Sequence, residues 1–398
     1  MKIDSVQTHD ESLTVTWTDG SKDQYHYVWL RDNLLEGHNL DLTTGERMCN
    51  FDELPARPRP MSTQVDEGDL EIVWQDTAQS CLYPAVWLRN NAYSDTAREL
   101  RTNLFPESAP WTFQHWDDGP SFDFRSIEQS AARELECLHA FKRYGVVYLR
   151  NTPAETGVAA SLCERLGYVR EVAFGRVREI RSDPATHHNV AFTSDEVNPH
   201  ADAANYLEPY QVQFLHCIAN EARGGDSRIV DARTLAEQFR RDEPTYFDTL
   251  ARVPVAYRIG AGGHDLRAEA PIIELDKNAR IRMVRFSNQQ RRALSVPHED
   301  VLPFFDAYRA FSALVNERAN QFHFRFAPGD ALMFDNYRLL HGRTSFEPAT
   351  GLRHLQLAST DMDMVDSRIR LLTKEVGEKE MTNRLLPDEV AGLRSAAR

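Results

Sequence analysis

Residues 198–206 read NPHADAANY and place His200 two positions before Asp202. On a strand, or at its extended exit, residues i and i+2 point to the same side. An imidazole and a carboxylate in that arrangement can share one metal ion, provided that a further ligand comes from elsewhere in the chain. Two histidines and one carboxylate on one face leave coordination positions open, and this set suits non-haem Fe(II) and oxygen.

A second pair of the same kind competes with the first, because short motifs of common residues recur by chance. Residues 298–300 read HED and directly precede an apolar stripe that predicts a helix over 301–320. We interpret Asp300 as the N-cap of this helix. The competing pair is therefore assigned to local structure, and we take the first pair as the candidate metal site.

The missing ligand is predicted far down the chain. Residues 321–326 and 331–336 alternate around a turn, so they predict a hairpin, and this hairpin leads the chain to His341. We call His200, Asp202 and His341 the metal triad.

Arg353 follows His341 by 12 residues, inside the apolar alternation LRHLQL of 352–357. A buried guanidinium needs an anionic partner, because an unpaired buried charge is costly. A cosubstrate carboxylate held bidentately would supply that partner. An internal salt bridge is the alternative.

The first hundred residues contain a repeat. LTVTW at 13–17 returns as LEIVW at 70–74, and each copy leads through a polar turn to a second strand. These second strands are predicted to end in VWLRDN (28–33) and VWLRNN (86–91). Two related hairpins predict a small β domain over residues 1–100.

The second predicted domain covers residues 101–398. Its first part, 101–127, is rich in Pro, Trp and Asp, which is typical of a linker between domains. Beyond the linker, helical and strand periods alternate along the chain.

The bulk composition excludes several classes of partner. The chain has 398 residues and a net charge of −14, which argues against nucleic acid and anionic membranes but not against a small anion met by local arginines. It shows no signal-peptide core and no apolar run of the roughly 20 residues that span a bilayer. Its five cysteines form no CxC or CxxC pair, so we expect free thiols and a cytoplasmic protein.

The metal triad and Arg353, in this order and spacing, resemble the iron- and 2-oxoglutarate-dependent dioxygenases of the taurine dioxygenase superfamily. More narrowly, the chain resembles the γ-butyrobetaine hydroxylase-like branch through VWLRDN, VWLRNNAY, NVAFT, VQFLHCI and DNYRLLHGR. The resemblance covers essentially the whole chain. It implies a mainly β protein with helices, in which a double-stranded β-helix (jelly-roll) catalytic domain follows a small N-terminal β domain, and it implies a homodimer.

The resemblance also implies roles. The triad would hold Fe(II), Arg353 would grip the far carboxylate of 2-oxoglutarate, and reaction with O2 would yield succinate, carbon dioxide and an oxidised substrate. Asn189 matches a position near the cosubstrate, and Asn288 matches one near the substrate.

One departure from the branch concerns zinc. Relatives often hold zinc through a cysteine cluster just after WLRDN and a later histidine. Here residues 34–39 read LLEGHN, the next cysteine is Cys49, and DTAQ (76–79) stands where the histidine would lie. We expect no structural zinc.

A second departure concerns the substrate. Betaine hydroxylases surround a trimethylammonium group with aromatic rings, as cation–π attraction requires. The matching positions here are Phe174, Arg178, Phe192 and Ala203. A cation at Arg178 disfavours a betaine, so we expect Arg178 to face an anionic group of the substrate. Surface pairing with Glu179 or Glu171 is the alternative.

The predicted activity is hydroxylation of an aliphatic carbon in a small polar molecule, anionic or zwitterionic, other than γ-butyrobetaine. The same cofactors could instead support desaturation or another oxidative rearrangement in a natural-product pathway. A jelly-roll protein that binds a ligand without turnover is the alternative from a different class, but such a protein has no need of an open iron site.

Overall fold

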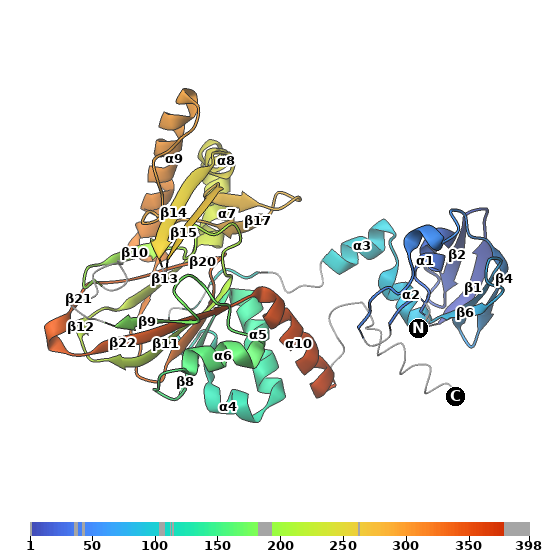
Figure 1. Cartoon of the computed structure of the whole chain (residues 1–398), viewed down its shortest axis with the longest axis horizontal. Coiled ribbons are helices and arrows are strands. Elements are labelled where there is room, and N and C mark those ends of the chain that lie inside the picture. Colours follow the sequence, from blue (N-terminus) through green and yellow to red (C-terminus); the bar gives the residue numbers. More distant parts are fainter. Residues whose placement is uncertain are drawn as a thin grey trace. The chain divides into compact units, whose positions relative to one another are not determined.

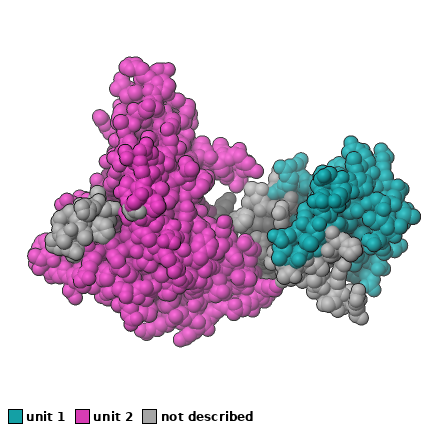
Figure 2. Space-filling model, viewed as in Figure 1, with its two compact units in different colours: residues 1–106, 380–398 teal, residues 107–379 magenta. Residues whose placement is uncertain are grey.

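The computed structural model describes residues 2–35, 39–41, 44–102, 108–111, 113, 115–181, 193–261 and 263–377. The chain forms two compact units, an N-terminal unit ending at residue 106 and a C-terminal unit over 107–379, which Figure 2 shows in separate colours. Among the helices in the described ranges, none combines the length and apolar character that crossing a membrane requires.

The N-terminal unit consists of two similar halves. The first contains β1 (Ile3–Thr8), β2 (Ser12–Trp17), β3 (Lys22–His26) and α1 (Tyr27–Asp32), and the second contains β4 (Pro60–Asp66), β5 (Asp69–Trp74), β6 (Ser80–Tyr83) and α2 (Ala85–Asn91). Each half forms an antiparallel three-stranded sheet. The repeated segments LTVTW and LEIVW lie in the central strands β2 and β5, so the predicted repeat is confirmed. A 3-10 turn (Phe51–Glu53) and α3 (Asp95–Thr102) complete the unit.

The prediction that VWLRDN and VWLRNN end strands is wrong. Residues 28–32 lie in α1, with Asn33 as its C-cap, and residues 86–91 lie in α2. Tyr27 and Leu30 in α1 are buried three residues apart, as are Ala85 and Leu88 in α2. This spacing belongs to one face of a helix and not to one face of a strand.

The two halves exchange equivalent contacts. The Tyr25 hydroxyl donates to the carbonyl oxygen of Leu88 (2.8 Å), and the Tyr83 hydroxyl donates to that of Leu30 (2.7 Å). Arg31 pairs with Asp76 in the turn of the second half (2.8 Å), and Arg89 pairs with Asp19 in the turn of the first (3.5 Å). The sequence repeat is therefore also a repeat of three-dimensional contacts.

The C-terminal unit is built on two sheets. The major sheet has the order β7 (Ser121–Asp123), β8 (Val146–Arg150), β19 (Ala331–Asp335), β11 (Val212–Asn220), β22 (Arg353–Thr360) and β9 (Val177–Arg181). The minor sheet has the order β10 (Val197–His200), β20 (Leu339–Arg343), β13 (Ser227–Asp231) and β18 (Phe322–Phe324). Neighbouring strands are antiparallel in both sheets, except β7 and β8.

Successive side chains along the strands of the major sheet point to opposite faces, and both faces are buried. Tyr148 and Phe334 lie in one core with Ile229 and Leu339 of the minor sheet. Val147, next to Tyr148, lies in a separate core that the neighbouring helices complete. Two facing sheets with a shared core form the double-stranded β-helix, so the predicted jelly roll is confirmed.

Helices cover the outer faces of the sheets. Figure 1 shows α4 (Phe124–Gln129), α5 (Ala131–Tyr144), α6 (Val158–Leu166) and α10 (Met362–Val376) on one side of this unit, and α7 (Ala232–Asp242), α8 (Pro244–Arg252) and α9 (His298–Asn316) on the other. Short pairs complete the unit: β12 (Arg223–Gly224) with β21 (Phe346–Glu347), β14 (Val255–Ala261) with β15 (His264–Ala270), and β16 (Ile273–Leu275) with β17 (Ile281–Val284).

The predicted hairpin before His341 is wrong. β18 pairs with β13 in the minor sheet, whereas β19 lies between β8 and β11 in the major sheet. The turn over 327–330 therefore carries the chain from one sheet to the other. Gly329 has φ +84° in this turn, and a Cβ there would meet the carbonyl oxygen of Thr152 at 2.6 Å. Local alternation predicted two strands correctly but could not show that they belong to different sheets.

The predicted N-cap of α9 is also wrong. The helix begins at His298, three residues earlier than predicted, with Pro297 before it and no side-chain cap. Asp300 lies in the first turn and pairs with Arg252 of α8 (2.6 Å). The HED segment is nevertheless structural, so it remains excluded as a metal site.

Candidate metal centre and its cavity

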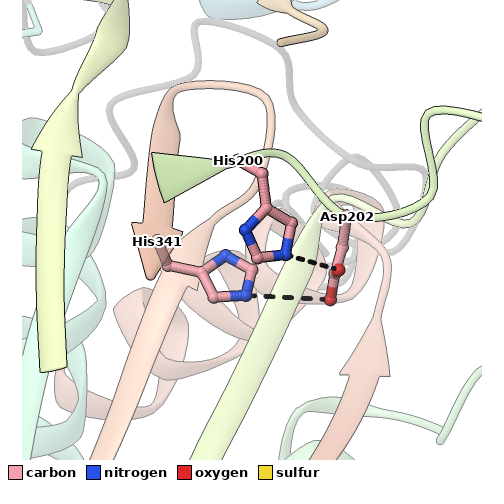
Figure 3. Close-up of side chains that lie close together, drawn as sticks. All are labelled: His200, Asp202 and His341. Carbon is pink, nitrogen blue, oxygen red and sulfur yellow. Dashed lines mark ion pairs between the residues drawn. The ribbon is translucent and has the colours of Figure 1, made fainter. Parts of the chain in front are cut away.

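Strand pairing brings the two histidines of the metal triad together. β10 and β20 are antiparallel neighbours, and His200 is the register partner of His341. Side chains of directly opposed residues lie on the same face of a sheet, and these two ring centroids are 4.6 Å apart. Figure 3 shows both rings turned toward the carboxylate of Asp202.

A turn held by Asn336 positions Asp202. The backbone N–H of Asp202 donates to Asn336 Oδ1 (2.8 Å), and Asn336 Nδ2 donates to the carbonyl oxygen of Asp202 (2.9 Å). The preceding N–H, that of Ala201, donates to the carbonyl oxygen of Phe286 (2.8 Å). Ala203 then takes the left-handed conformation, with φ +59°. These bonds hold the carboxylate beside the end of β10.

The donor atoms of the triad fit one metal ion. One ligand atom from each of the three residues lies within 4.8 Å of the others. Asp202 Oδ1 is 3.5 Å from His200 Nε2, and Asp202 Oδ2 is 3.9 Å from His341 Nε2. His200 Nδ1 lies 3.0 Å from the carbonyl oxygen of Asn198, so it carries the proton and leaves the Nε2 lone pair free for a metal.

Burial and the neighbouring His200 ring lower the pKa of His341 to about 3. The His341 ring is therefore neutral near pH 7, as metal binding requires. Burial raises the pKa of Asp202, but the charge of Arg178 and the contact with His200 outweigh it and hold that pKa well below its ordinary value. The centre thus offers the Nε2 atoms of two imidazoles and one anionic oxygen.

Arg178 is the partner of this carboxylate. Its Nη2 donates to Asp202 Oδ2 at 3.0 Å, and both side chains are buried. Its guanidinium carbon also lies 5.4 Å from the ring centroid of Phe174. Glu179 instead contacts His354 and Gln356. The surface pairing considered as the alternative is therefore wrong. The anion that Arg178 faces was expected to come from the substrate, but in the structure it is the carboxylate of Asp202.

Arg353 lies in the same cavity without a carboxylate partner among the described residues. Arg353 is 5% exposed, and its Nε atom makes no hydrogen bond to the described residues. Its guanidinium lies 5.5 Å from the Phe346 ring centroid. Burial and the nearby Arg343 lower the pKa of Arg353 to about 10. The internal salt bridge considered from the sequence is not present in the described ranges, and a bound anion would supply the missing charge.

A cavity of about 430 Å³ connects these groups. Strands of both sheets contribute to its wall, together with the turn after His200 and the segment 289–292. Its charged lining residues are Arg178, Arg258, Arg292, Arg343, Arg353 and Asp202, with the two histidines beside them. Among the described lining residues, five are therefore arginines and one is a carboxylate.

The predicted substrate residues divide into three groups. Phe174, Arg178 and Ala203 line the cavity. Asn288 is exposed and accepts a hydrogen bond from the Tyr308 hydroxyl (3.3 Å), and its neighbours Gln289 and Gln290 line the cavity in its place. Asn189 and Phe192 lie outside the described residues.

Four residues of the site were not predicted from the sequence. Asn336 holds the Asp202 turn, and Asn205, Arg258 and Arg292 line the cavity. Two of them were open to notice, because Asn205 lies inside the NPHADAANY stretch and Asn336 inside DNYRLLHGR. The two arginines carry no local signal, because only the folded chain brings 258 and 292 to one wall.

Two imidazoles and one carboxylate at the rim of a jelly roll, beside an unpaired buried arginine, define the class of non-haem Fe(II) oxygenases with an anionic cosubstrate. The donor set fits Fe(II), because all three ligands lie on one side and the other side opens to the cavity.

Comparison with known protein families supports the same class. The profile of the taurine catabolism dioxygenase TauD, TfdA family matches residues 107–358, and that of the γ-butyrobetaine hydroxylase-like N-terminal family matches residues 5–89. The chain belongs to the TauD/TfdA family, in its γ-butyrobetaine hydroxylase-like branch. It is therefore a dioxygenase that uses Fe(II) and 2-oxoglutarate.

Characterised relatives align over almost the whole chain. A γ-butyrobetaine dioxygenase of Pseudomonas sp. (strain AK-1) is 32% identical, over 93% of this chain and 96% of its own. The human γ-butyrobetaine dioxygenase is also 32% identical, over 92% and 95%. A trimethyllysine dioxygenase of Meyerozyma guilliermondii is 27% identical, over 93% and 96%.

Among solved structures, an asparagine oxygenase in complex with Fe(II), 2S,3S-3-hydroxyasparagine and succinate aligns with a TM-score of 0.47 and 17% identity. It covers 66% of this chain and 89% of its own.

Proposed function

We propose that this enzyme hydroxylates an aliphatic carbon of a small anionic molecule that carries no quaternary ammonium group. The observation that supports this most directly is the charge of the cavity. Asp202 is the single carboxylate among the described lining residues, and Arg178 already pairs with it. Within the described wall, no acidic side chain is left to balance a cationic substrate.

Arg178 argues separately against a betaine. A trimethylammonium group needs open aromatic faces, but the Arg178 guanidinium already lies over Phe174. Ala203 contributes a methyl group where a cage would need a ring. A second cation beside Arg178 would also meet like-charge repulsion in a largely buried place. γ-Butyrobetaine, the substrate in the names of two relatives, is thus a poor match.

The roles proposed for the residues follow from their contacts. His200, Asp202 and His341 would hold Fe(II), which supplies the oxygen chemistry when bound with 2-oxoglutarate. Arg178 would keep Asp202 Oδ2 occupied, leaving Oδ1 to the metal. Arg353 would bind the far carboxylate of 2-oxoglutarate in its buried position. The cavity walls between these groups would orient the substrate.

The direct test is substrate-stimulated release of succinate from 2-oxoglutarate, with Fe(II) and O2. The panel contains γ-butyrobetaine, trimethyllysine and short mono- and dicarboxylic acids. We expect stimulation by an acid without a quaternary nitrogen, no activity in His200→Ala, and a rise of at least about tenfold in the 2-oxoglutarate KM in Arg353→Met. Efficient turnover of γ-butyrobetaine would contradict the proposed substrate class.

Mass spectrometry of the product separates the remaining possibilities. Gain of one oxygen atom is the expected result, whereas loss of two hydrogens would indicate desaturation. Binding of a ligand with no succinate release by the Fe(II)-loaded protein would indicate a protein without turnover. The homodimer stays a prediction, and analytical ultracentrifugation of the full chain tests it.

A further inference from the structure

We propose that Asn205, Arg258 and Arg292 form the subsite that binds the anionic group of the substrate, a carboxylate or an oxyanion of similar size. This inference rests on the proposed function and names the residues that would select for it. Arg258 and Arg292 line the described cavity wall and are used neither by Asp202 nor, in the proposed function, by the cosubstrate.

Asn205 supplies a buried donor that the described structure leaves without an acceptor. The residue is 2% exposed and lines the cavity, yet its Nδ2 has no hydrogen-bond partner among the described residues. An unpaired buried amide donor costs free energy, so such groups normally meet a partner. Asn205 follows Asp202 by three residues, which places the two backbones within roughly 10 Å. A short molecule can therefore reach both the metal centre and Asn205.

Arg258 and Arg292 belong to the same wall as Asn205. The backbone N–H of Asn205 donates to Gln290 Oε1 (3.2 Å), and the backbone N–H of Arg258 donates to the carbonyl oxygen of Gln290 (3.0 Å). Arg292 Nη2 in turn donates to the carbonyl oxygen of Arg258 (2.8 Å). Gln290 thus ties the turn after the metal ligands to the two arginines, and all four residues line the cavity.

The charge on this wall is only partly compensated. Arg292 has no acidic partner among the described residues. Arg258 pairs with Asp265 (2.7 Å), but the same carboxylate also contacts Arg267. One aspartate between two guanidiniums leaves net positive charge next to Arg292. A buried amide donor and two exposed guanidiniums that line the same cavity suit a carboxylate, whose two oxygens accept several hydrogen bonds.

The other cationic groups of the cavity are committed elsewhere. Arg178 pairs with Asp202, and Arg353 is assigned to the cosubstrate. Arg343 donates to the carbonyl oxygens of Thr193 and Asp195. Among the described lining residues, the subsite that we propose is thus the place that still offers a substrate anion both a free donor and a positive charge.

Anaerobic binding to protein loaded with Mn(II) and the non-reacting analogue N-oxalylglycine tests the subsite without turnover. The probes are butanoate, butanamide and butyltrimethylammonium, which share a short alkyl chain and differ in charge. Paramagnetic broadening of probe proton signals by Mn(II) reports binding near the metal. We expect butanoate to bind at least about tenfold more tightly than either other probe.

The variants are Arg292→Gln, Arg258→Gln and Asn205→Asp, with Arg267→Gln as the matched control. Arg267 shares Asp265 with Arg258 but does not line the cavity. We expect at least about tenfold weaker butanoate binding in Arg292→Gln and Asn205→Asp, a smaller loss in Arg258→Gln, and none in Arg267→Gln. Unchanged affinity for Mn(II) and N-oxalylglycine shows that each variant is folded.

The subsite would be overturned if wild type, Arg292→Gln and Asn205→Asp bound butanoate equally. It would also be overturned if the wild type bound no butanoate or preferred butyltrimethylammonium. A different result would contradict the proposed function. In that result butanoate binds and its binding depends on Arg292, but the Fe(II)-loaded wild type releases no succinate with any acid in the panel.

Discussion

The carboxylate of Asp202 is buried, and the guanidinium of Arg178 balances its charge. The side chain of Asp202 is 6% exposed to solvent and that of Arg178 is 12% exposed. A buried ion pair is sensitive to the loss of either member, because the other is then left as an unpaired charge. The metal-free protein therefore depends on this pair more strongly than the metal-bound protein does.

Arg178→Ala should lower the free energy of unfolding of the metal-free protein by about 3 kcal/mol. Mn(II) should recover part of the loss, because the cation takes over the compensation of Asp202. Urea denaturation with and without Mn(II) measures both effects. Arg176→Ala is the control, since Arg176 is 58% exposed and pairs with Glu164 at the surface, so it should cost less than about 1 kcal/mol. Equally small losses of unfolding free energy in Arg178→Ala and Arg176→Ala would contradict the role of Arg178 as the partner of the buried Asp202 carboxylate.

At the scale of elements, the metal centre depends on how closely β10 approaches β20. Gly342 follows His341, and a Cβ at this position would meet the carbonyl oxygen of Val197 at 2.4 Å. A real side chain cannot occupy that space, so any larger residue forces the two strands apart. Separation of the strands would also separate His200 from His341, which are register partners.

Gly342→Ala should weaken Mn(II) binding by roughly tenfold or more and lower the free energy of unfolding by about 1–3 kcal/mol, as overpacking does. Isothermal titration calorimetry gives the affinity. Gly260→Ala is a suitable control, because its nearest contact for a Cβ is the His264 carbonyl oxygen at 3.9 Å. Undiminished Mn(II) affinity in Gly342→Ala would show that the strand spacing does not set the ligand geometry.

The helices behind the major sheet are joined at Glu134 of α5. This buried carboxylate accepts hydrogen bonds from Arg165 of α6 (2.6 Å) and Arg368 of α10 (2.8 Å). Burial raises the pKa of Glu134, but the hydrogen bonds from Arg368 and Arg165 outweigh it and bring the pKa below its ordinary 4.5. Because the folded-state pKa is depressed, this stabilisation is complete above pH 4.5 and is lost as the pH falls through the folded-state value.

Glu134→Gln should be about 2 kcal/mol less stable than wild type above pH 4.5, because both charge-assisted hydrogen bonds are weakened. Below that pH the difference in the free energy of unfolding between the two proteins should become smaller, since wild-type Glu134 becomes protonated and then resembles glutamine. Urea denaturation over a pH series measures this difference. A constant difference across the series would mean that Glu134 does not titrate with unfolding.

For the whole molecule, contacts between the two halves hold the N-terminal unit together. The exchanged hydrogen bonds of Tyr25 and Tyr83 and the ion pairs of Arg31 and Arg89 cross from one half to the other. Cys81 is buried in the core of this unit. Among the described residues, the triad is the one group of three that could hold a metal. A structural zinc site normally requires four Cys or His ligands together.

The metal content of the full chain should accordingly be one divalent cation per chain, and none in His200→Ala. Elemental analysis after dialysis against Fe(II) or Mn(II) under anaerobic conditions gives the ratio. Stoichiometric zinc that survives the His200→Ala change would place a structural site in the N-terminal unit and overturn the expectation of a zinc-free unit.

Local pattern was reliable where the determining contacts lie close together in the sequence. LTVTW and LEIVW predicted strands because alternate residues are buried, and they are the central strands β2 and β5. VWLRDN was misread because six residues contain too few turns to distinguish a helix from a strand end. Residues 322–335 were misread because alternation shows a strand but not its partner, which lies in different sheets for β18 and β19.

The sequence by itself determined the chemistry and the family. Ligand identity, order and spacing of His200, Asp202, His341 and Arg353 are properties of the chain, and metal coordination tolerates few other residue types. Only the tertiary structure decided which charges remain free. Arg178 and Asp202 are 24 residues apart, and Asn205, Arg258 and Arg292 share one wall only after folding. Electrostatic compensation depends on distance and burial in space, so the sequence could disfavour a betaine through Arg178 but could not show which cavity arginines lack an acidic partner.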